Sequence, residues 1–81
     1  MRIRLLLFAL YRDLTGVDEL AIDVEEGSTA AVALATIRAR DARFGPLPER
    51  PVVAVNREFA HLDIRLNDGD ELALLPPVAG G

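Results

Sequence analysis

The sequence predicts an α+β fold in which a mixed sheet packs on one main helix. Five segments carry the alternating or β-branched apolar patterns of strands, and one longer segment has the apolar period of a helix. Their order is ββαβββ, with the main helix after the first two strands. A strand that follows a crossover helix is expected to pair parallel with an earlier strand through a right-handed connection. Such a sheet would grip the helix on one face and form a two-layer domain.

The first strand, residues 2–8, has an apolar face and a mixed face. The apolar face should meet the core, and its members are Ile3, Leu5 and Leu7. The mixed face changes from arginine to apolar side chains and ends in Leu6 and Phe8. Two interpretations of this end stay open. Leu6 and Phe8 either form an exposed patch or lie under a short helix expected at residues 9–14.

A second strand completes a hairpin with the first, and the main helix follows it. The short helix between the two strands should end at Gly16, because glycine readily adopts the left-handed conformation of a helix cap. Residues 19–24 alternate between apolar and acidic or small side chains, as in a half-buried strand. Ser28 or Thr29 is expected to cap the main helix, residues 29–40. One helix face is apolar and partly small, and it consists of Ala30, Ala33, Leu34 and Ile37.

The connector after the main helix leads into a buried strand. Residues 41–50 contain one glycine and two prolines, so they are expected to lack regular structure. Phe44 or Leu47 should fill the edge of the core from this connector. Residues 51–55 are apolar and largely β-branched, which is typical of a strand buried on both faces.

The last third of the chain predicts two further strands. Asn56-Arg57 tolerates the positive φ of a tight turn and should lead into a very short strand, residues 58–60. Residues 61–66 are expected to be irregular and to reach the core through Leu62, Ile64 and Leu66. Asp68-Gly69-Asp70 then turns the chain into the last strand, residues 71–75.

Composition restricts the function of this chain of 81 residues. Thirteen acids against nine bases give a net charge of −4, which argues against nucleic acid as a partner. All nine bases are arginine, so the chain has no lysine amine to link copies of itself through isopeptide bonds. The absence of cysteine excludes disulfides, thiolate metal sites and cysteine nucleophiles. We expect no bound metal or cofactor.

The apolar start of the chain resembles a signal peptide only superficially. Its apolar run is short for that purpose, and Arg12-Asp13 stands where a cleavage site would need small residues. We therefore expect a cytoplasmic protein without membrane association. Residues 49–81 hold six acids and three arginines, so a basic partner pocket is the expected complement to this half.

The C-terminal segment is the strongest functional signal in the sequence. It reads Leu74-Leu75-Pro76-Pro77-Val78-Ala79-Gly80-Gly81. The two prolines favour an extended chain, and the two glycines can pass through a channel too narrow for side chains. The last strand delivers this segment without a flexible linker. We expect residues 1–75 to form the folded domain and residues 76–81 a tail with a reactive carboxylate on Gly81.

Three other candidate sites are more simply explained as structure. His61 is the only histidine and has no second nitrogen or sulfur ligand to share a metal with. The acids of residues 68–71 are typical of a turn and do not match a calcium loop. Residues 27–29 could hold a phosphate at a helix start but are more typical of an ordinary cap.

The outward faces of the first and last strands suggest a partner surface. If these strands are neighbours, their outward apolar residues form one patch beside the origin of the tail. The residues of this patch are Leu6, Phe8, Ala73 and Leu75.

Several motifs resemble those of the small subunits of molybdopterin synthases, a family of ubiquitin-like β-grasp sulfur carriers. They are the ββαβββ order, Asn56 after a valine-rich strand, Asp68-Gly69-Asp70-Glu71 after Leu66, and the tail from Pro76 to Gly81. The likeness covers the whole chain, although only the acidic turn and the tail are specific. Arg57 departs from the family, which often has glycine at this position.

The resemblance implies a ubiquitin-like β-grasp fold and a sulfur-carrier mechanism. An ATP-dependent, ubiquitin-activating-like adenylyltransferase would adenylate the carboxylate of Gly81, and persulfide sulfur would replace the adenylate to leave a thiocarboxylate. The tail would then enter the large synthase subunit, within a heterotetramer, and give its sulfur to a cyclic pyranopterin phosphate. The chain itself would be a non-catalytic sulfur donor, because the catalytic pocket lies on the large subunit.

The implied site consists of the tail and the patch. Gly81 would carry the sulfur, Gly80 would keep the tail narrow, and ATP would be bound only by the activating enzyme. The implied partner contacts are Leu6, Phe8, Leu75, Pro76, Pro77, Val78 and Ala79. Two alternatives stay open: the thiazole-forming sulfur carrier of thiamine synthesis, and a ubiquitin-like modifier that is conjugated to other proteins.

Overall fold

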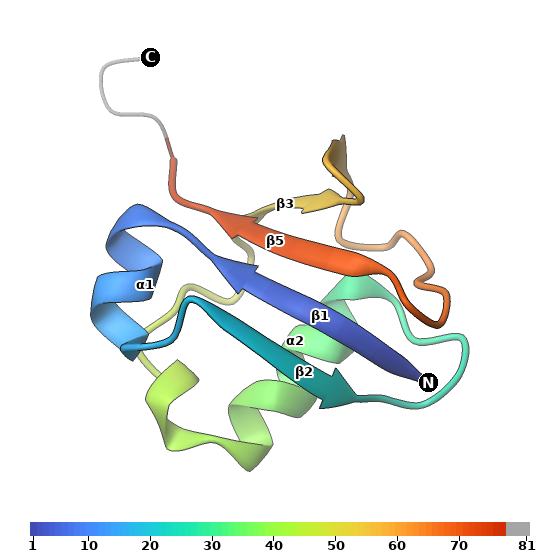
Figure 1. The fold of residues 1–81 in the computed structure, drawn as a ribbon, viewed down its shortest axis with the longest axis horizontal. Helices are drawn as coiled ribbons and strands as arrows, with labels where there is room; N and C mark the ends of the chain where they lie inside the picture. Colours follow the sequence, from blue (N-terminus) through green and yellow to red (C-terminus); the bar gives the residue numbers. More distant parts are fainter. Residues whose placement is uncertain (78–81) are drawn as a thin grey trace.

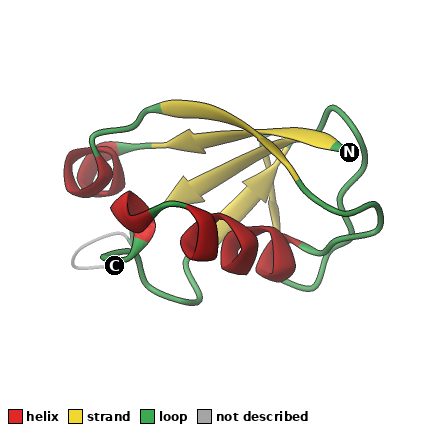
Figure 2. Ribbon diagram, turned by 90° about the horizontal axis from the view of Figure 1, so that it is seen from below, coloured by secondary structure: helices red, strands yellow, loops and turns green. Residues whose placement is uncertain are grey.

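The computed structural model describes residues 1–77, which form a sheet with helices against one of its faces (Figures 1 and 2). The sheet order is β2-β1-β5-β3-β4. Figure 2 shows α2 across one face of the sheet, and no helix or strand formed by residues 1–77 covers the opposite face. In chain order the elements are β1 (Arg2–Leu7), α1 (Ala9–Thr15), β2 (Glu19–Asp23), α2 (Ala30–Arg40), the 3₁₀ helix η1 (Ala42–Phe44), β3 (Val52–Val55), β4 (Glu58–Ala60) and β5 (Glu71–Leu75).

The strand pairing confirms the mixed sheet but corrects one predicted partner. β1 pairs antiparallel with β2 and parallel with β5. The strand after the main helix, β3, pairs antiparallel with both β5 and β4, so the expectation that it pairs parallel with an earlier strand is wrong. The parallel pair is formed by β5, which lies between β1 and β3 and whose residues 72–74 are all buried.

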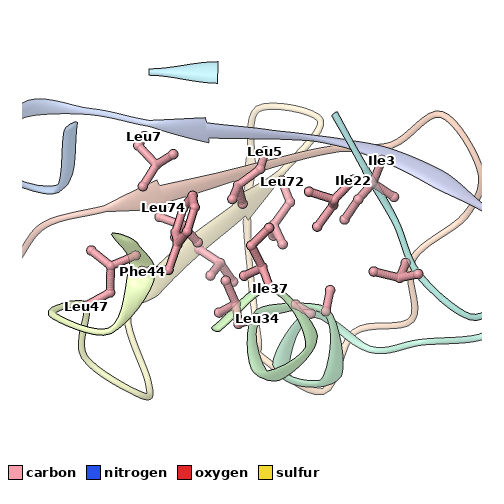
Figure 3. Close-up of a cluster of buried hydrophobic side chains, with 14 of the residues drawn as sticks. Ile3, Leu5, Leu7, Ile22, Leu34, Ile37, Phe44, Leu47, Leu72 and Leu74 are labelled. Atoms are coloured by element: carbon pink, nitrogen blue, oxygen red, sulfur yellow. The ribbon is translucent and has the colours of Figure 1, made fainter. Parts of the chain in front are cut away.

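The core lies between the sheet and α2. Figure 3 shows the inward side chains of β1 and β5 meeting those of α2 and of the connector after it. The predicted inward face of β1 is confirmed, because Ile3, Leu5 and Leu7 are all buried. The predicted helix face is confirmed as well, and its buried members are Ala30, Ala33, Leu34 and Ile37. Small alanines allow α2 to approach the sheet closely.

The connector is more ordered than its composition predicts. Residues 42–44 form η1, whereas the sequence predicts no regular structure. Phe44 is fully buried and Leu47 is nearly so, so both side chains fill the edge of the core. Figure 3 shows Phe44 between Leu47 and Leu74 of β5. The connector therefore supports the strand that leads to the tail.

The helices and strands begin and end where local hydrogen bonds and backbone conformations require it. Gly16 has φ 73° and its N–H bonds the carbonyl of Arg12, as expected for a left-handed cap of α1. The hydroxyl of Thr29 accepts a hydrogen bond from the N–H of Val32 at 3.2 Å, which caps α2. β1 ends at Leu7, one residue earlier than predicted, because Phe8 already precedes α1. Pro51 has no N–H for the ladder, and β3 begins one residue after it.

Two predicted core residues lie outside the core. Val52 is 46% exposed, although the sequence predicts a strand buried on both faces. It pairs with Leu75 at one end of the sheet, on the face that α2 does not cover. Ile64 is 36% exposed, and it supports α2 through its carbonyl, which accepts a hydrogen bond from the N–H of Ala30. Leu66 is buried and Leu62 partly buried, as predicted.

Asp41 lies between α2 and η1, and its hydrogen bonds predict that the folded domain loses stability in acid. Its carboxylate accepts hydrogen bonds from the backbone N–H of Arg43 at 3.0 Å and from the Arg43 guanidinium at 2.6 Å. These bonds hold the pKa of the Asp41 carboxyl below its ordinary value. A lowered folded-state pKa adds stability above the unfolded-state value, and this stability is lost as the pH falls through the folded-state value. Asp41→Asn keeps the capping oxygen and removes the charge, so it should destabilise at neutral pH and be nearly neutral in acid.

Urea unfolding midpoints at neutral pH and well below the ordinary Asp pKa of about 3.9 would check this expectation. The control is Asp63→Asn, which removes an exposed acid that forms no ion pair with any residue from 1 to 77. An equal loss of stability by Asp41→Asn at both pH values would contradict the linkage.

Candidate functional site

A groove of about 390 Å³ hollows the sheet face opposite α2. We call it the sheet groove. Alternation along the strands creates it, because the inward residues of β1 and β5 form the core and the intervening residues face outward. Its lining residues are Arg4, Leu6, Phe8, Ala54, Arg57, Phe59, Glu71, Ala73 and Leu75.

The shape of the sheet groove comes from one row of residues across four strands. Leu6 pairs with Ala73, Ala73 with Ala54, and Ala54 with Phe59. The two alanines on the central strands form a low floor, and larger side chains stand at both ends of the row. Phe59 is 79% exposed, so an aromatic side chain stands beside this floor at one edge of the sheet. A large exposed aromatic beside an apolar hollow is typical of a partner surface.

One end of the sheet groove is polar, and several of the polar side chains there form ion pairs or hydrogen bonds with one another. The guanidinium of Arg4 lies 2.6 Å from Glu19 and 3.2 Å from Glu71. The predicted tight turn is confirmed, because Asn56 has φ 51° and Arg57 has φ 71°. The Asn56 side chain donates to Asp70 Oδ1 at 2.9 Å and accepts from the N–H of Glu71 at 3.0 Å. This amide therefore fixes the β3–β4 turn to the start of β5.

The other end of the sheet groove is apolar and adjoins the tail. β1 and β5 run parallel, so both strands finish at the same edge of the sheet (Figure 1). Phe8 and Pro76 directly follow the two strands, and Phe8 is 45% exposed. The sequence-predicted tail residues Val78, Ala79, Gly80 and Gly81 lie outside the described residues. The last described residues, Pro76 and Pro77, thus leave the sheet beside the groove.

The sheet groove resolves the two interpretations of Leu6 and Phe8. Both side chains line the groove together with Ala73 and Leu75, so the short helix does not cover them. Instead, α1 directs its buried side chains, Tyr11 and Thr15, toward the core.

Sequence reasoning missed the half of the groove that β3 and β4 supply. Their contributions, Ala54, Arg57 and Phe59, join it only because β5 lies between β1 and β3. The one local signal was an aromatic residue in a very short strand after a tight turn.

Two of the remaining candidate residues make structural hydrogen bonds, and His61 is exposed. Asp68 Oδ1 accepts the backbone N–H of Arg2 at 2.7 Å, and the hydroxyl of Ser28 donates to the carbonyl of Glu25 at 2.6 Å. Within the described part of the chain, no three His, Cys, Asp or Glu side chains gather as a metal site. None of the helices formed by residues 1–77 is both long and apolar enough to span a bilayer.

Comparisons with known proteins agree with this geometry. The model of the ThiS family matches residues 5–81. The molybdopterin synthase sulfur carrier subunit of Chlamydomonas reinhardtii is 34% identical over 83 residues, covering 100% of both chains. Small archaeal modifier protein 3 of Haloferax volcanii is 35% identical over 92 residues, also covering 100% of both. The crystal structure of SAMP1 from Haloferax volcanii superposes with a TM-score of 0.82 at 30% identity, covering 100% of both chains. The chain therefore belongs to the ThiS family and has the ubiquitin-like β-grasp fold that its sequence motifs predict.

Proposed function

We propose that this chain is the sulfur carrier subunit of a molybdopterin synthase and that Gly81 carries the sulfur. The observation that carries the proposal is the parallel pairing of β1 and β5. Because of this pairing, β5 ends at the rim of the sheet groove, and Pro76 and Pro77 leave the sheet there. A partner that binds the groove would hold the base of the tail in a fixed place. The full-length match to the Chlamydomonas reinhardtii sulfur carrier subunit supports this function.

The chemistry starts from the α-carboxylate of Gly81. A carboxylate is inert to substitution, so an adenylyltransferase first joins it to AMP from ATP and releases pyrophosphate. The terminal sulfur of a persulfide then attacks the acyl carbon, and AMP leaves. A thiol reduces the resulting acyl disulfide to a thiocarboxylate. As that sulfur bonds to a carbon of the cyclic pyranopterin phosphate, the C–O bond at that carbon breaks and the oxygen leaves. Water then hydrolyses the acyl C–S bond, which leaves the sulfur on the pyranopterin and returns Gly81 to a carboxylate.

The small size of the chain indicates that the reaction pocket and the ATP site belong to its partners. A domain of 81 residues with a shallow groove offers a docking face rather than an enclosed reaction chamber. We assign the reaction pocket to the large synthase subunit and ATP binding to the activating enzyme. Gly80 and Gly81 add no side chain to the tail, and Pro76 and Pro77 limit the entropy that the tail loses when it is threaded into either partner.

A second candidate function is conjugation to other proteins. Its specific support is the full-length match to small archaeal modifier protein 3. Activation of a Gly-Gly carboxylate is a chemistry that both functions share, and they differ in whether sulfur or a lysine amine receives the acyl group. The chain has no lysine, so a modifier of this sequence would add to other proteins singly rather than as self-linked chains.

The intact mass of the protein purified from its own cells tests the proposed function. We expect a fraction in which one oxygen of the chain is replaced by sulfur, fragment masses that place the change on Gly81, and a co-purifying larger synthase subunit. An unmodified carboxylate, together with isopeptide linkage to lysines of other proteins, would overturn the sulfur carrier and establish the modifier. A modified Gly81 that co-purifies with thiazole-forming enzymes would assign the sulfur to thiamine synthesis instead.

A further inference from the structure

Arg57 has a left-handed backbone conformation, which is unfavourable for a residue that carries a side chain. It is the second residue of the two-residue β3–β4 turn, and its φ is 71°. Both central residues of such turns need positive φ, which asparagine tolerates and glycine adopts without strain. Asn56 suits the first position, whereas an arginine at the second position costs stability that glycine would not. Backbone strain of this kind is commonly retained where the side chain has a function.

Arg57 lines the sheet groove and has no acidic partner among residues 1–77. Two nearby acids are already engaged: Glu71 pairs with Arg4, and Asp70 accepts hydrogen bonds from Asn56 and from the N–H of Asn67. Glu58 follows Arg57 in the chain but lines a different hollow and not the sheet groove. Among the described residues, none forms an ion pair with Arg57. The acidic half of the chain therefore presents a positive charge at this end of the groove.

We propose that Arg57 determines partner specificity by pairing with a carboxylate of the large synthase subunit. This inference rests on the proposed function and extends it to the chemistry of the partner surface. The partner would place an apolar side chain over Ala54 and Ala73 and an Asp or Glu beside Arg57. A guanidinium binds a carboxylate through two parallel hydrogen bonds, which fixes orientation as well as charge. A partner with a basic residue at this place would be rejected by like-charge repulsion.

Two substitutions separate the charge of Arg57 from its backbone strain. Arg57→Gly removes both, and Arg57→Lys keeps the charge and the strain but loses the paired hydrogen bonds. We expect Arg57→Gly to raise the Tm and yet weaken binding to the isolated large subunit by about tenfold, with a weaker dependence of Kd on salt. Arg57→Lys should keep the Tm and salt dependence and bind with intermediate affinity. Calorimetric titration at low and high salt, with thermal unfolding of each variant, gives all three quantities.

The substitution Phe8→Glu tests the sheet groove separately, because Phe8 lies at its apolar end. We expect it to weaken binding to the large subunit. Unchanged affinity and salt dependence of Arg57→Gly, alongside weakened binding of Phe8→Glu, would overturn the role of Arg57 and leave the groove as the interface. Unchanged affinity of both variants would overturn the groove as the docking face, whereas the sulfur on Gly81 is judged by the intact mass alone. A lower Tm of Arg57→Gly would overturn the argument from strain.

Discussion

Deletion of Gly80 and Gly81 is expected to abolish sulfur loading and leave the folded domain unchanged. The deletion draws the terminal carboxylate back by about 7 Å along an extended chain, so it cannot reach a reaction centre placed for the full tail. It also places the carboxylate on Ala79, whose methyl group would enter a channel sized for glycine. Among the described residues, the buried core extends from Ile3 to Leu74 and ends before the tail begins, so we expect no change in the free energy of unfolding.

Loading can be followed by incubating the purified carrier with its activating enzyme, ATP and a persulfide donor and then measuring its intact mass. The expected result is complete loss of the oxygen-to-sulfur exchange in the deletion variant. Gly81→Ala should keep the fold and block loading or the later transfer of sulfur. Ala79→Gly is the matched control, because it keeps the length and the Gly-Gly end and should load normally. Sulfur on the deletion variant would contradict the requirement of loading for the Gly80-Gly81 end.

Local patterns predicted those parts of the fold that depend on neighbouring residues. The alternation in β1 identified its buried face because successive side chains of a strand point to opposite sides. The preference of Asn56 for positive φ predicted the tight turn, and the spacing of the apolar residues predicted the buried face of α2. Each of these features is decided within about eight residues, so no knowledge of the sheet order was needed.

The sheet groove depends on the sheet order, which local patterns do not contain. Ala54 and Ala73 are far apart in sequence and become a common floor only because β5 pairs with β3. Phe59 stands next to that floor for the same reason. The sequence named Leu6, Phe8, Ala73 and Leu75 as one patch because adjacency of the first and last strands was expected from the fold. It left open whether the short helix covers Leu6 and Phe8. It missed the contribution of β4, and with it the most exposed aromatic side chain of the described chain.

Phe44→Ala and Phe59→Ala delete the same atoms, but we expect the first to lower the stability of the domain and the second to weaken partner binding. Phe44 is fully buried, so its truncation removes apolar contacts and leaves a cavity at a cost of about 3–5 kcal/mol. A domain of this size has a total stability of roughly 4–12 kcal/mol, so this loss would bring it close to unfolding. Phe59 is 79% exposed, and its truncation should change stability by no more than about 0.5 kcal/mol.

Urea unfolding and titration with the large subunit would measure both properties for each variant. Phe59→Ala should unfold normally and bind at least about tenfold more weakly, since exposed aromatics beside an apolar hollow often dominate an interface. Phe44→Leu is the conservative control for the core and should lose less than Phe44→Ala because most of the side-chain volume remains. Comparable destabilisation by Phe44→Ala and Phe59→Ala would contradict the assignment of Phe44 to the core and Phe59 to the docking face. A contrast between them would show that the same truncation affects folding at the buried Phe44 of the connector and partner binding at the exposed Phe59 of the sheet.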